Sequence, residues 1–145
     1  MPSIAPHLIA PCGMNCAICS GYLAHKNRPR FKGMMSHCQG CRPRNKQCAF
    51  LKKRCADNLK LLHGEVDFCF ECDCFPCESL RRLDSRYRHE FNMSMIDNLM
   101  EIKENGLNTF LEKQHQKYAC RQCGGLLSVH SQKCFNCDKI ESWKR

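Results

Sequence analysis

Apolar residues recur at helical spacing in the second half of the chain. Met95, Leu99 and Ile102 recur at three- and four-residue spacing, which is the pattern of a helix with one apolar face. Ser94 stands before this run as an N-cap residue, and Gly106 follows it as a stop. The pattern therefore predicts a helix between these two residues.

Four further segments have helical patterns of apolar residues. They are residues 16–26, 49–64, 76–91 and 108–117. Gly64 ends the second of these segments, and Pro76 stands just ahead of the third, where proline suits the start of a helix. The chain lacks a pattern of alternating strands and helices, so the elements expected here are short helices and irregular loops.

The supply of apolar side chains is small. The hydrophobic fraction of 43% includes 15 cysteines, and a chain of this length has only marginal stability from apolar burial. We expect a small α-rich, partly irregular protein that is stapled by metal ions. The cysteines divide it into a metal-binding region (residues 1–80), a helical segment that packs on it (81–118) and a tail resembling a zinc ribbon or knuckle (119–145).

The tail contains two Cys-x₂-Cys pairs, separated by a loop of ten residues. The four cysteines are Cys120, Cys123, Cys134 and Cys137. A two-residue spacer lets both sulfurs of a pair reach one ion, and two pairs complete the tetrahedron that Zn²⁺ prefers. His130 lies inside the loop. In one interpretation it is a catalytic base or exchangeable ligand, and in the other it donates a hydrogen bond to a metal ligand or lies at the surface. Four thiolates favour the second interpretation.

The other eleven cysteines lie between residues 12 and 77 and are harder to partition. Cys16, Cys19, Cys38 and Cys41 form two Cys-x₂-Cys pairs and predict a second zinc site. Cys48, Cys55, Cys69 and Cys72 predict a third, with Cys77 or Cys12 as a substitute ligand. Cys12, Cys74 and Cys77 are then left over, as free thiols or as a sign that the pairing is different.

The first three cysteines have the Cys-x₃-Cys-x₂-Cys spacing that radical S-adenosylmethionine enzymes use for a cluster with one open iron. Those enzymes need a large partial barrel, and this chain has neither the length nor the alternation of strands and helices. Cys38 and Cys41 are also available to close the site. An iron–sulfur cluster without radical chemistry stays open as an alternative to zinc in this region, because thiolate sites accept both metals.

The net charge of +9 is concentrated in the first part of the chain. Residues 1–56 contain ten Lys and Arg and no acidic residue, whereas the rest has a charge of −1. This asymmetry favours an anionic partner, nucleic acid or an acidic protein, at the basic region 26–54. The alternative is charge balance, because three zinc ions with four thiolates each would lower +9 to about +3.

Several motifs in order resemble a cysteine-rich bacterial and archaeal family that is catalogued only as a domain of unknown function. They are CGMNCAICSGYLA, CQGC, CAFLKKRCA and FCFECDCFPCESLRRL. The later stretches resemble extended members with a zinc-ribbon-like tail. The resemblance implies metal binding at Cys12, Cys16, Cys19, Cys38, Cys41, Cys48, Cys55, Cys69, Cys72 and Cys77. Cys74 departs from the pattern, since relatives often have an acidic residue there, so it is the best candidate for a non-ligand.

Three classes of function fit these residues. The first is a structural zinc protein, with two or three ions per chain, that acts as an interaction module for nucleic acid or protein. The second is a redox or metal-handling protein that uses Cys12, Cys74 or Cys77 as reactive thiols. The third is a small metalloenzyme with His37, His63 or Glu71 as participants, which is less favoured because a closed thiolate site leaves no position for water.

The start of the chain, MPSIAPHLIAPCGM, lacks the basic and apolar segments of a signal peptide, and no stretch has the apolar length of a membrane span. We therefore expect a cytoplasmic protein that does not enter the membrane. Thiols stay reduced in that compartment, and cysteine pairs there bind metal more often than they form disulfides.

Overall fold

The computed structural model describes residues 4–26, 40, 42, 60, 63–134 and 136–137. Their α-helices are α1 (Ser20–Lys26), α4 (Glu78–Phe91), α5 (Met95–Asn105) and α6 (Leu107–Tyr118), and their 3₁₀ turns are η1 (Pro6–Leu8), η2 (Cys16–Ile18) and η3 (Cys69–Glu71). These residues form isolated β-bridges but no strand. The expectation of an α-rich, partly irregular chain is confirmed for the described part.

The helix predicted after Ser94 is confirmed as α5. The Ser94 hydroxyl accepts a hydrogen bond from the backbone N–H of Asp97 (3.0 Å), and Gly106 ends the helix. The helix predicted over 108–117 is one residue longer at each end, and that over 76–91 begins at Glu78. The segment 16–26 is divided at Cys19 into η2 and α1. Most of the segment 49–64 lies outside the described residues.

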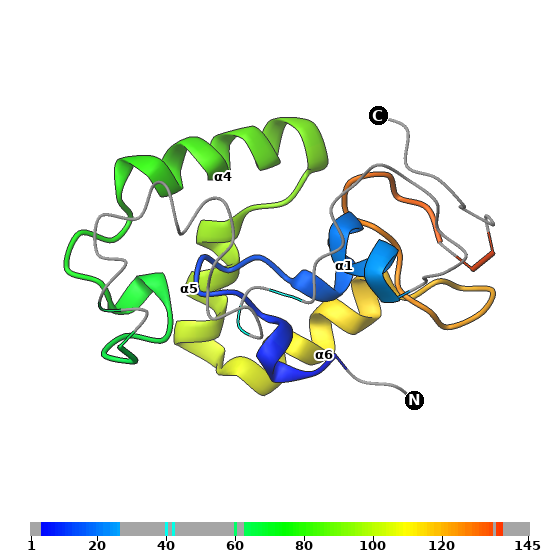
Figure 1. The fold of residues 1–145 in the computed structure, drawn as a ribbon, viewed down its shortest axis with the longest axis horizontal. Coiled ribbons are helices and arrows are strands. Elements are labelled where there is room, and N and C mark those ends of the chain that lie inside the picture. Colours follow the sequence, from blue (N-terminus) through cyan, green and yellow to red (C-terminus); the bar gives the residue numbers. More distant parts are fainter. Residues whose placement is uncertain are drawn as a thin grey trace.

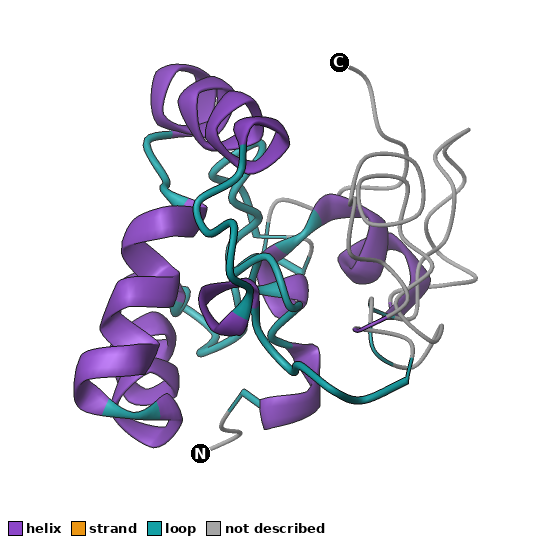
Figure 2. Ribbon diagram, turned by 90° about the vertical axis from the view of Figure 1, so that its left-hand side faces the viewer, coloured by secondary structure: helices purple, strands orange, loops and turns teal. Residues whose placement is uncertain are grey.

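The N-terminal loop is buried along its whole length. Residues 8–18 are all buried, and the loop is closed by a bridge between Ile9 and Asn15 and by a hydrogen bond from the Ala10 N–H to the Met14 carbonyl (2.8 Å). Figure 1 shows this loop (dark blue) in the middle of the molecule, and Figure 2 shows loops (teal) that cross the middle of the molecule between the helices. The first cysteine motif is therefore part of the core.

Gly13 at the tip of this loop touches the first turn of α5. Its φ of +90° is in the region that favours glycine. A Cβ atom at this position would lie 2.6 Å from the carbonyl oxygen of Met95 and 2.9 Å from Cγ of Leu99. Glycine is thus required in the Cys-Gly-Met motif by the close approach of α5, in addition to its backbone angle.

The core joins residues that are far apart in the sequence. Helix α5 packs against both α4 and α6, and its Leu99 is fully buried together with Ile18 of the N-terminal part and Phe110 of α6. Val129 of the tail is 1% exposed and belongs to the same cluster. Figure 1 shows the tail loop (orange) beside α1 and the end of α6. The tail therefore contributes to the apolar core.

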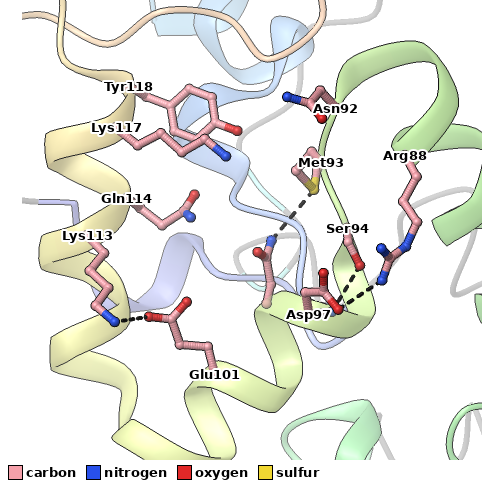
Figure 3. Close-up of a pocket in the computed structure, with 11 residues that line it drawn as sticks. Arg88, Asn92, Met93, Ser94, Asp97, Glu101, Lys113, Gln114, Lys117 and Tyr118 are labelled. Atoms are coloured by element: carbon pink, nitrogen blue, oxygen red, sulfur yellow. Dashed lines mark hydrogen bonds and ion pairs between the residues drawn. The ribbon is translucent and has the colours of Figure 1, made fainter.

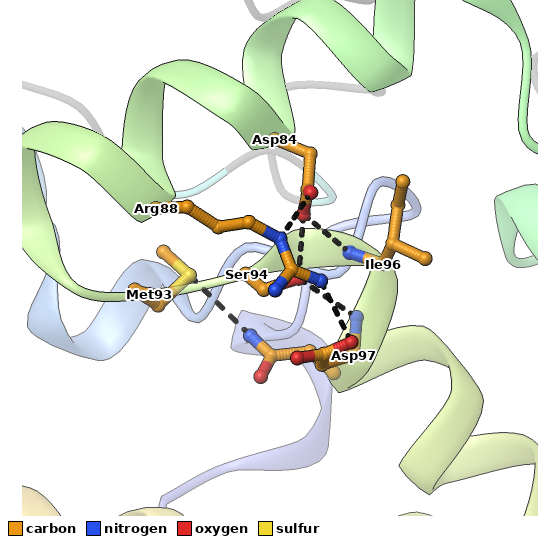
Figure 4. Close-up of polar contacts among 7 residues, drawn as sticks. Asp84, Arg88, Met93, Ser94, Ile96 and Asp97 are labelled. Carbon is orange, nitrogen blue, oxygen red and sulfur yellow. Dashed lines mark hydrogen bonds and ion pairs between the residues drawn. The ribbon is translucent and has the colours of Figure 1, made fainter.

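A buried carboxylate connects α4 to the start of α5 (Figure 4). Asp84 is 5% exposed, and its Oδ1 accepts hydrogen bonds from the Ser94 hydroxyl (2.6 Å) and from the Ile96 N–H (3.0 Å). Arg88 donates to Asp84 Oδ2 (2.7 Å) and to Asp97 Oδ1 (2.8 Å). Burial alone raises the pKa of Asp84, but these hydrogen bonds and the charge of Arg88 outweigh burial, so its pKa lies below the usual value.

None of the described helices has the length and apolar character needed to cross a membrane.

Candidate metal centre

The four tail cysteines are brought together by two short turns after α6. The chain leaves this helix at Tyr118 and turns at Cys120–Gly124, where the Gly124 N–H donates to the Cys120 carbonyl (2.8 Å). Gly124 has a φ of +77°, which glycine adopts without strain. Bridges between Ala119 and Leu126 and between Leu127 and Cys134 then return the chain to the first pair. The glycine after the first pair and the length of the loop place both pairs side by side.

The sulfur atoms of these residues all lie within 4.8 Å of one another. The Sγ atoms of Cys120 and Cys137 are 3.7 Å apart, and those of Cys123 and Cys134 are 3.5 Å apart. Four sulfurs bound to one ion at about 2.3 Å in a tetrahedron would be about 3.8 Å apart. The arrangement therefore fits a single tetrahedral metal ion.

Hydrogen bonds make the four thiols unequal. The Gly125 N–H donates to the Cys123 sulfur (3.4 Å), and this bond, with others from Cys137 and Cys134, lowers the pKa of Cys123 to about 6. The neighbouring thiolate at Cys123 keeps a proton on Cys137 and raises its pKa to about 12. Burial raises the pKa of Cys134. Four thiolates cannot coexist here without a cation, because each ionised sulfur disfavours the next.

The loop between the two pairs is attached to the N-terminal region. The Val129 N–H donates to the Ile18 carbonyl (2.9 Å), and the hydroxyls of Ser128 and Ser20 are 2.7 Å apart. His130 accepts a hydrogen bond at Nδ1 from the Ser20 N–H (3.3 Å), and its Nε2 lies 2.9 Å from the Tyr87 hydroxyl. The cysteine cluster thus fixes a loop whose middle is docked on α1 and α4.

His130 is not one of the clustered ligands. Its ring lies in edge contact with Phe91 and Tyr87, and both ring nitrogens are in hydrogen bonds with residues of the N-terminal region and α4. These contacts make His130 a link between three segments. The sequence gives no local signal for this role, because Ser20 is 110 residues away.

The structure describes seven of the eleven N-terminal cysteines. Cys12 and Cys16 are buried, Cys74 is exposed, and Cys19, Cys69, Cys72 and Cys77 are half-buried. The Cys69 N–H donates to the Pro11 carbonyl (2.9 Å), which joins η3 to the tip of the N-terminal loop. The sulfurs of Cys72 and Cys74 are 3.3 Å apart.

The predicted second and third metal sites each include residues beyond this part of the chain, since Cys38, Cys41, Cys48 and Cys55 lie outside the described residues. Within the described part, the four tail cysteines are the group of three or more metal-ligand side chains that comes together. The partition of the N-terminal cysteines stays a prediction.

Other predicted participants have structural contacts or an exposed position. Glu71 accepts hydrogen bonds at Oε1 from the N–H groups of Asp67 and Phe68, each 3.0 Å long, and so caps η3. His63 is exposed in a turn, and His37 lies outside the described residues. Arg42, a member of the basic region 26–54, donates to the carbonyl oxygens of Ile9 (2.7 Å) and Asp67 (2.8 Å).

The Arg42 guanidinium also lies 4.8 Å from the centre of the Phe68 ring. Its contacts tie the N-terminal loop to η3, so at least one of the basic residues has a structural role. The sequence offered no sign of it, because the contacts join three distant segments.

Comparison with known proteins gives a family for the first part of the chain. The model of a family described as "Protein of unknown function (DUF3795)" matches residues 8–82, just over half of the chain. No curated protein matches the chain, and no solved structure does. The matched segment contains all the N-terminal cysteines and ends before the tail cluster. The resemblance found in the cysteine motifs is confirmed: the chain belongs to the DUF3795 family.

Proposed function

We propose that this chain is a zinc-binding protein in which Cys120, Cys123, Cys134 and Cys137 hold one structural Zn²⁺. The observation that carries the proposal is the gathering of four sulfurs within 4.8 Å. Thiolates favour zinc among the common divalent ions, and four protein ligands make a closed site. When bound, the ion would cross-link the two Cys-x₂-Cys turns of a zinc knuckle or ribbon.

The zinc site would act as a staple between the tail and the region matched by the family. The docked loop carries Ser128 and Val129, which are 0% and 1% exposed. Without a cross-link at its base, a loop of ten residues would lose much conformational entropy when it docks. The few docking contacts would barely offset that cost. In this proposal the chain has three parts, residues 1–80, 81–118 and 119–145, with further zinc in the first part to give two or three ions per chain.

Metal analysis of anaerobically purified protein tests the proposal. We expect colourless wild-type protein with two or three zinc ions per chain, and the variant Cys123→Ser with one ion fewer. Cys74→Ser is the matched control, because this exposed cysteine is the predicted non-ligand. An unchanged metal content in Cys123→Ser and in Cys134→Ser would overturn the assignment of the tail site.

The absorption spectrum of the same sample distinguishes zinc from an iron–sulfur cluster. Iron–sulfur clusters absorb visible light, whereas Zn²⁺ has no such absorption because its d shell is full. A brown sample with iron in the wild type and in the tail variants alike would assign a cluster to the N-terminal cysteines. The tail site would be unaffected by that result.

The biological role proposed for this module is to bind nucleic acid or an acidic protein through the basic region 26–54. Charge asymmetry supports it, since the first 56 residues contain no acidic side chain. We expect a single-stranded oligonucleotide to be retained at low salt. Retention should weaken in the double variant Lys52→Gln, Lys53→Gln and persist in Arg81→Gln, Lys103→Gln, which has the same charge. No retention by the wild type at low salt would remove nucleic acid as a partner.

A second candidate function, thiol-based metal handling, is favoured by the 3.3 Å separation of the Cys72 and Cys74 sulfurs on an exposed loop. Titration of the holo-protein with a thiol reagent tests it. A fast-reacting thiol that is lost in Cys74→Ser would support this function, and slow reaction of every thiol would exclude it.

A further inference from the structure

A polar cavity of about 480 Å³ lies between the α4–α5 turn and α6 (Figure 3). Charged side chains from three helices surround it, and none of the lining residues is a cysteine. They include Arg88, Asp97, Glu101, Lys113 and Lys117. The volume is in the range of cavities that hold small metabolites. The cavity is separate from the proposed zinc site, whose four cysteines do not line it.

A chain of hydrogen bonds fixes the orientation of Gln114 at the wall of this cavity. The Ala17 N–H donates to Asn15 Oδ1 (3.0 Å), so the Asn15 amide presents Nδ2 to Gln114 and donates to its Oε1 (3.3 Å). Gln114 is 7% exposed, and its Nε2 makes no hydrogen bond with the described residues. Figure 3 shows this side chain extending from α6 into the cavity. The wall thus has a fixed pair of donor hydrogens.

Asn98 provides a fixed acceptor at the same cavity. Its Nδ2 donates to the Gly13 carbonyl (2.9 Å), which determines the amide orientation. Its Oδ1 then lacks a hydrogen-bond partner among the described residues, although the side chain is only 9% exposed. An amide oxygen that lines the cavity without a partner in the described residues can accept a hydrogen bond from a ligand.

The charges around the cavity are paired except at one point. Arg88 is bound to two carboxylates, and Lys113 Nζ lies 2.9 Å from Glu101 Oε1. This ion pair is poorly aligned for a hydrogen bond, so the same carboxylate oxygen can accept another donor. Lys117 has no carboxylate partner among the described residues and lies 5.4 Å from the Tyr118 ring. Three cations (Arg88, Lys113, Lys117) and two carboxylates (Asp97, Glu101) line the cavity, and Asp84 does not, so the lining has one positive charge in excess.

We propose that this cavity binds a small organic acid with a hydrogen-bond donor next to its carboxylate, that is, an amino acid or a hydroxy acid. The carboxylate would lie between Lys117 and the Nε2 hydrogens of Gln114. The neighbouring ammonium or hydroxyl would donate to Asn98 Oδ1. Both buried amides would then be satisfied, and the charge of Lys117 would be balanced.

Titration calorimetry of the zinc-loaded 145-residue chain with L-serine, L-lactate and propionate tests this proposal. All three probes have a carboxylate, but propionate lacks the adjacent donor. We expect saturable binding of serine, lactate or both, and binding of propionate at least about tenfold weaker. Serine without lactate would identify amino acids as the class, and the reverse would identify hydroxy acids. No saturable binding of serine or lactate would overturn the proposal.

Two pairs of variants locate the site. Lys117→Gln removes the unbalanced charge, and Lys103→Gln is its control, because it removes the same charge from the last turn of α5 outside the cavity. Gln114→Glu keeps the acceptor for Asn15 but places a negative charge against the ligand, with exposed Gln116→Glu as its control. We expect binding to weaken about tenfold or more in each cavity variant and to stay unchanged in each control.

Equal binding in Lys117→Gln and Lys103→Gln, or in Gln114→Glu and Gln116→Glu, would place the ligand elsewhere and overturn the proposal. Lys117 is exposed, so that variant is expected to fold. Its metal content and helical circular dichroism should match the wild type. Tail variants such as Cys123→Ser should lose zinc but still bind the organic acid. That result would show that the zinc site and the cavity can be tested separately.

Discussion

Asp84 and Cys123 each lie in a cluster of polar side chains, but the two clusters differ in the source of their counter-charge. The carboxylate of Asp84 is met by a guanidinium, a hydroxyl and a backbone N–H from the same chain. The tail sulfurs receive backbone N–H bonds at Cys123 and Cys134, with no cationic side chain in the group. The helical cluster contains its own counter-charge, whereas the four tail cysteines include no cation that would balance ionised sulfurs.

The two regions should be stabilised by different interactions. The helical region should depend on pH and on packing, and the tail should depend on metal. Because Val129 and the Ser128–Ser20 pair connect the tail to the N-terminal region, loss of the metal should also weaken the docking contacts. Variants can measure how much the stability of these docking contacts depends on the bound metal.

The largest effect is expected from the loss of a tail ligand. In Cys134→Ser the tail should lose its ion, whose binding contributes on the order of 10 kcal/mol to folding of a small zinc site. Amide hydrogens of residues 119–134 should then exchange rapidly with deuterium, while those of α5 keep most of their protection. Mass spectrometry of exchange resolves the two segments. Equal loss of protection in α5 would mean that the helical region also depends on this ion.

The next effect concerns the packing of the N-terminal loop on α5. Gly13→Ala should lower the free energy of unfolding by about 2–5 kcal/mol, the sum of a left-handed backbone angle and overpacking against Met95. Gly64→Ala is the matched control, since it has a φ of +75° but no atom within 4 Å of the added Cβ. It should lose only about 1–2 kcal/mol. Urea denaturation measures both; equal losses would contradict the packing explanation.

The elements and the tail cluster could be predicted because their signals are local. The apolar positions and the N-cap of α5 lie within twelve residues, and the tail pairs lie within one loop. The docking contacts could not be predicted, since Asn15 meets Gln114 and Ile18 meets Val129 across about a hundred residues. One missed residue did leave a signal: Asp84 follows Leu80 by four residues, on the buried side of α4.

A smaller effect is expected at that buried carboxylate. Asp84→Asn should lower the free energy of unfolding at pH 7 by about 1.5–3 kcal/mol, because hydrogen bonds to a charged acceptor become neutral ones. The pKa of Asp84 is lower in the folded protein than its unfolded value of about 3.9. Its contribution is therefore complete above that pH and is lost as the pH falls through the folded pKa.

Urea denaturation between pH 7 and pH 3 should show the difference between Asp84→Asn and wild type shrinking toward the acid end. The comparison between variants cancels any loss of metal that both share. Glu78→Gln serves as the control, because its carboxylate pairs with Arg82 at the surface, and it should change stability by less than about 1 kcal/mol. A difference that is constant with pH would rule out the charge of Asp84 as its source.

The smallest effect tests whether docking and metal binding are separable. Ser128 is fully buried, with its hydroxyl 2.7 Å from that of Ser20 and 3.2 Å from the His130 N–H. Ser128→Ala should lower the free energy of unfolding by about 1 kcal/mol and leave the zinc content unchanged. In Ser131→Ala, where the hydroxyl has one exposed contact, stability should hardly change. If Ser128→Ala released zinc, the docked loop would be supporting the cysteine cluster. Metal binding would then depend on docking, instead of docking on metal binding.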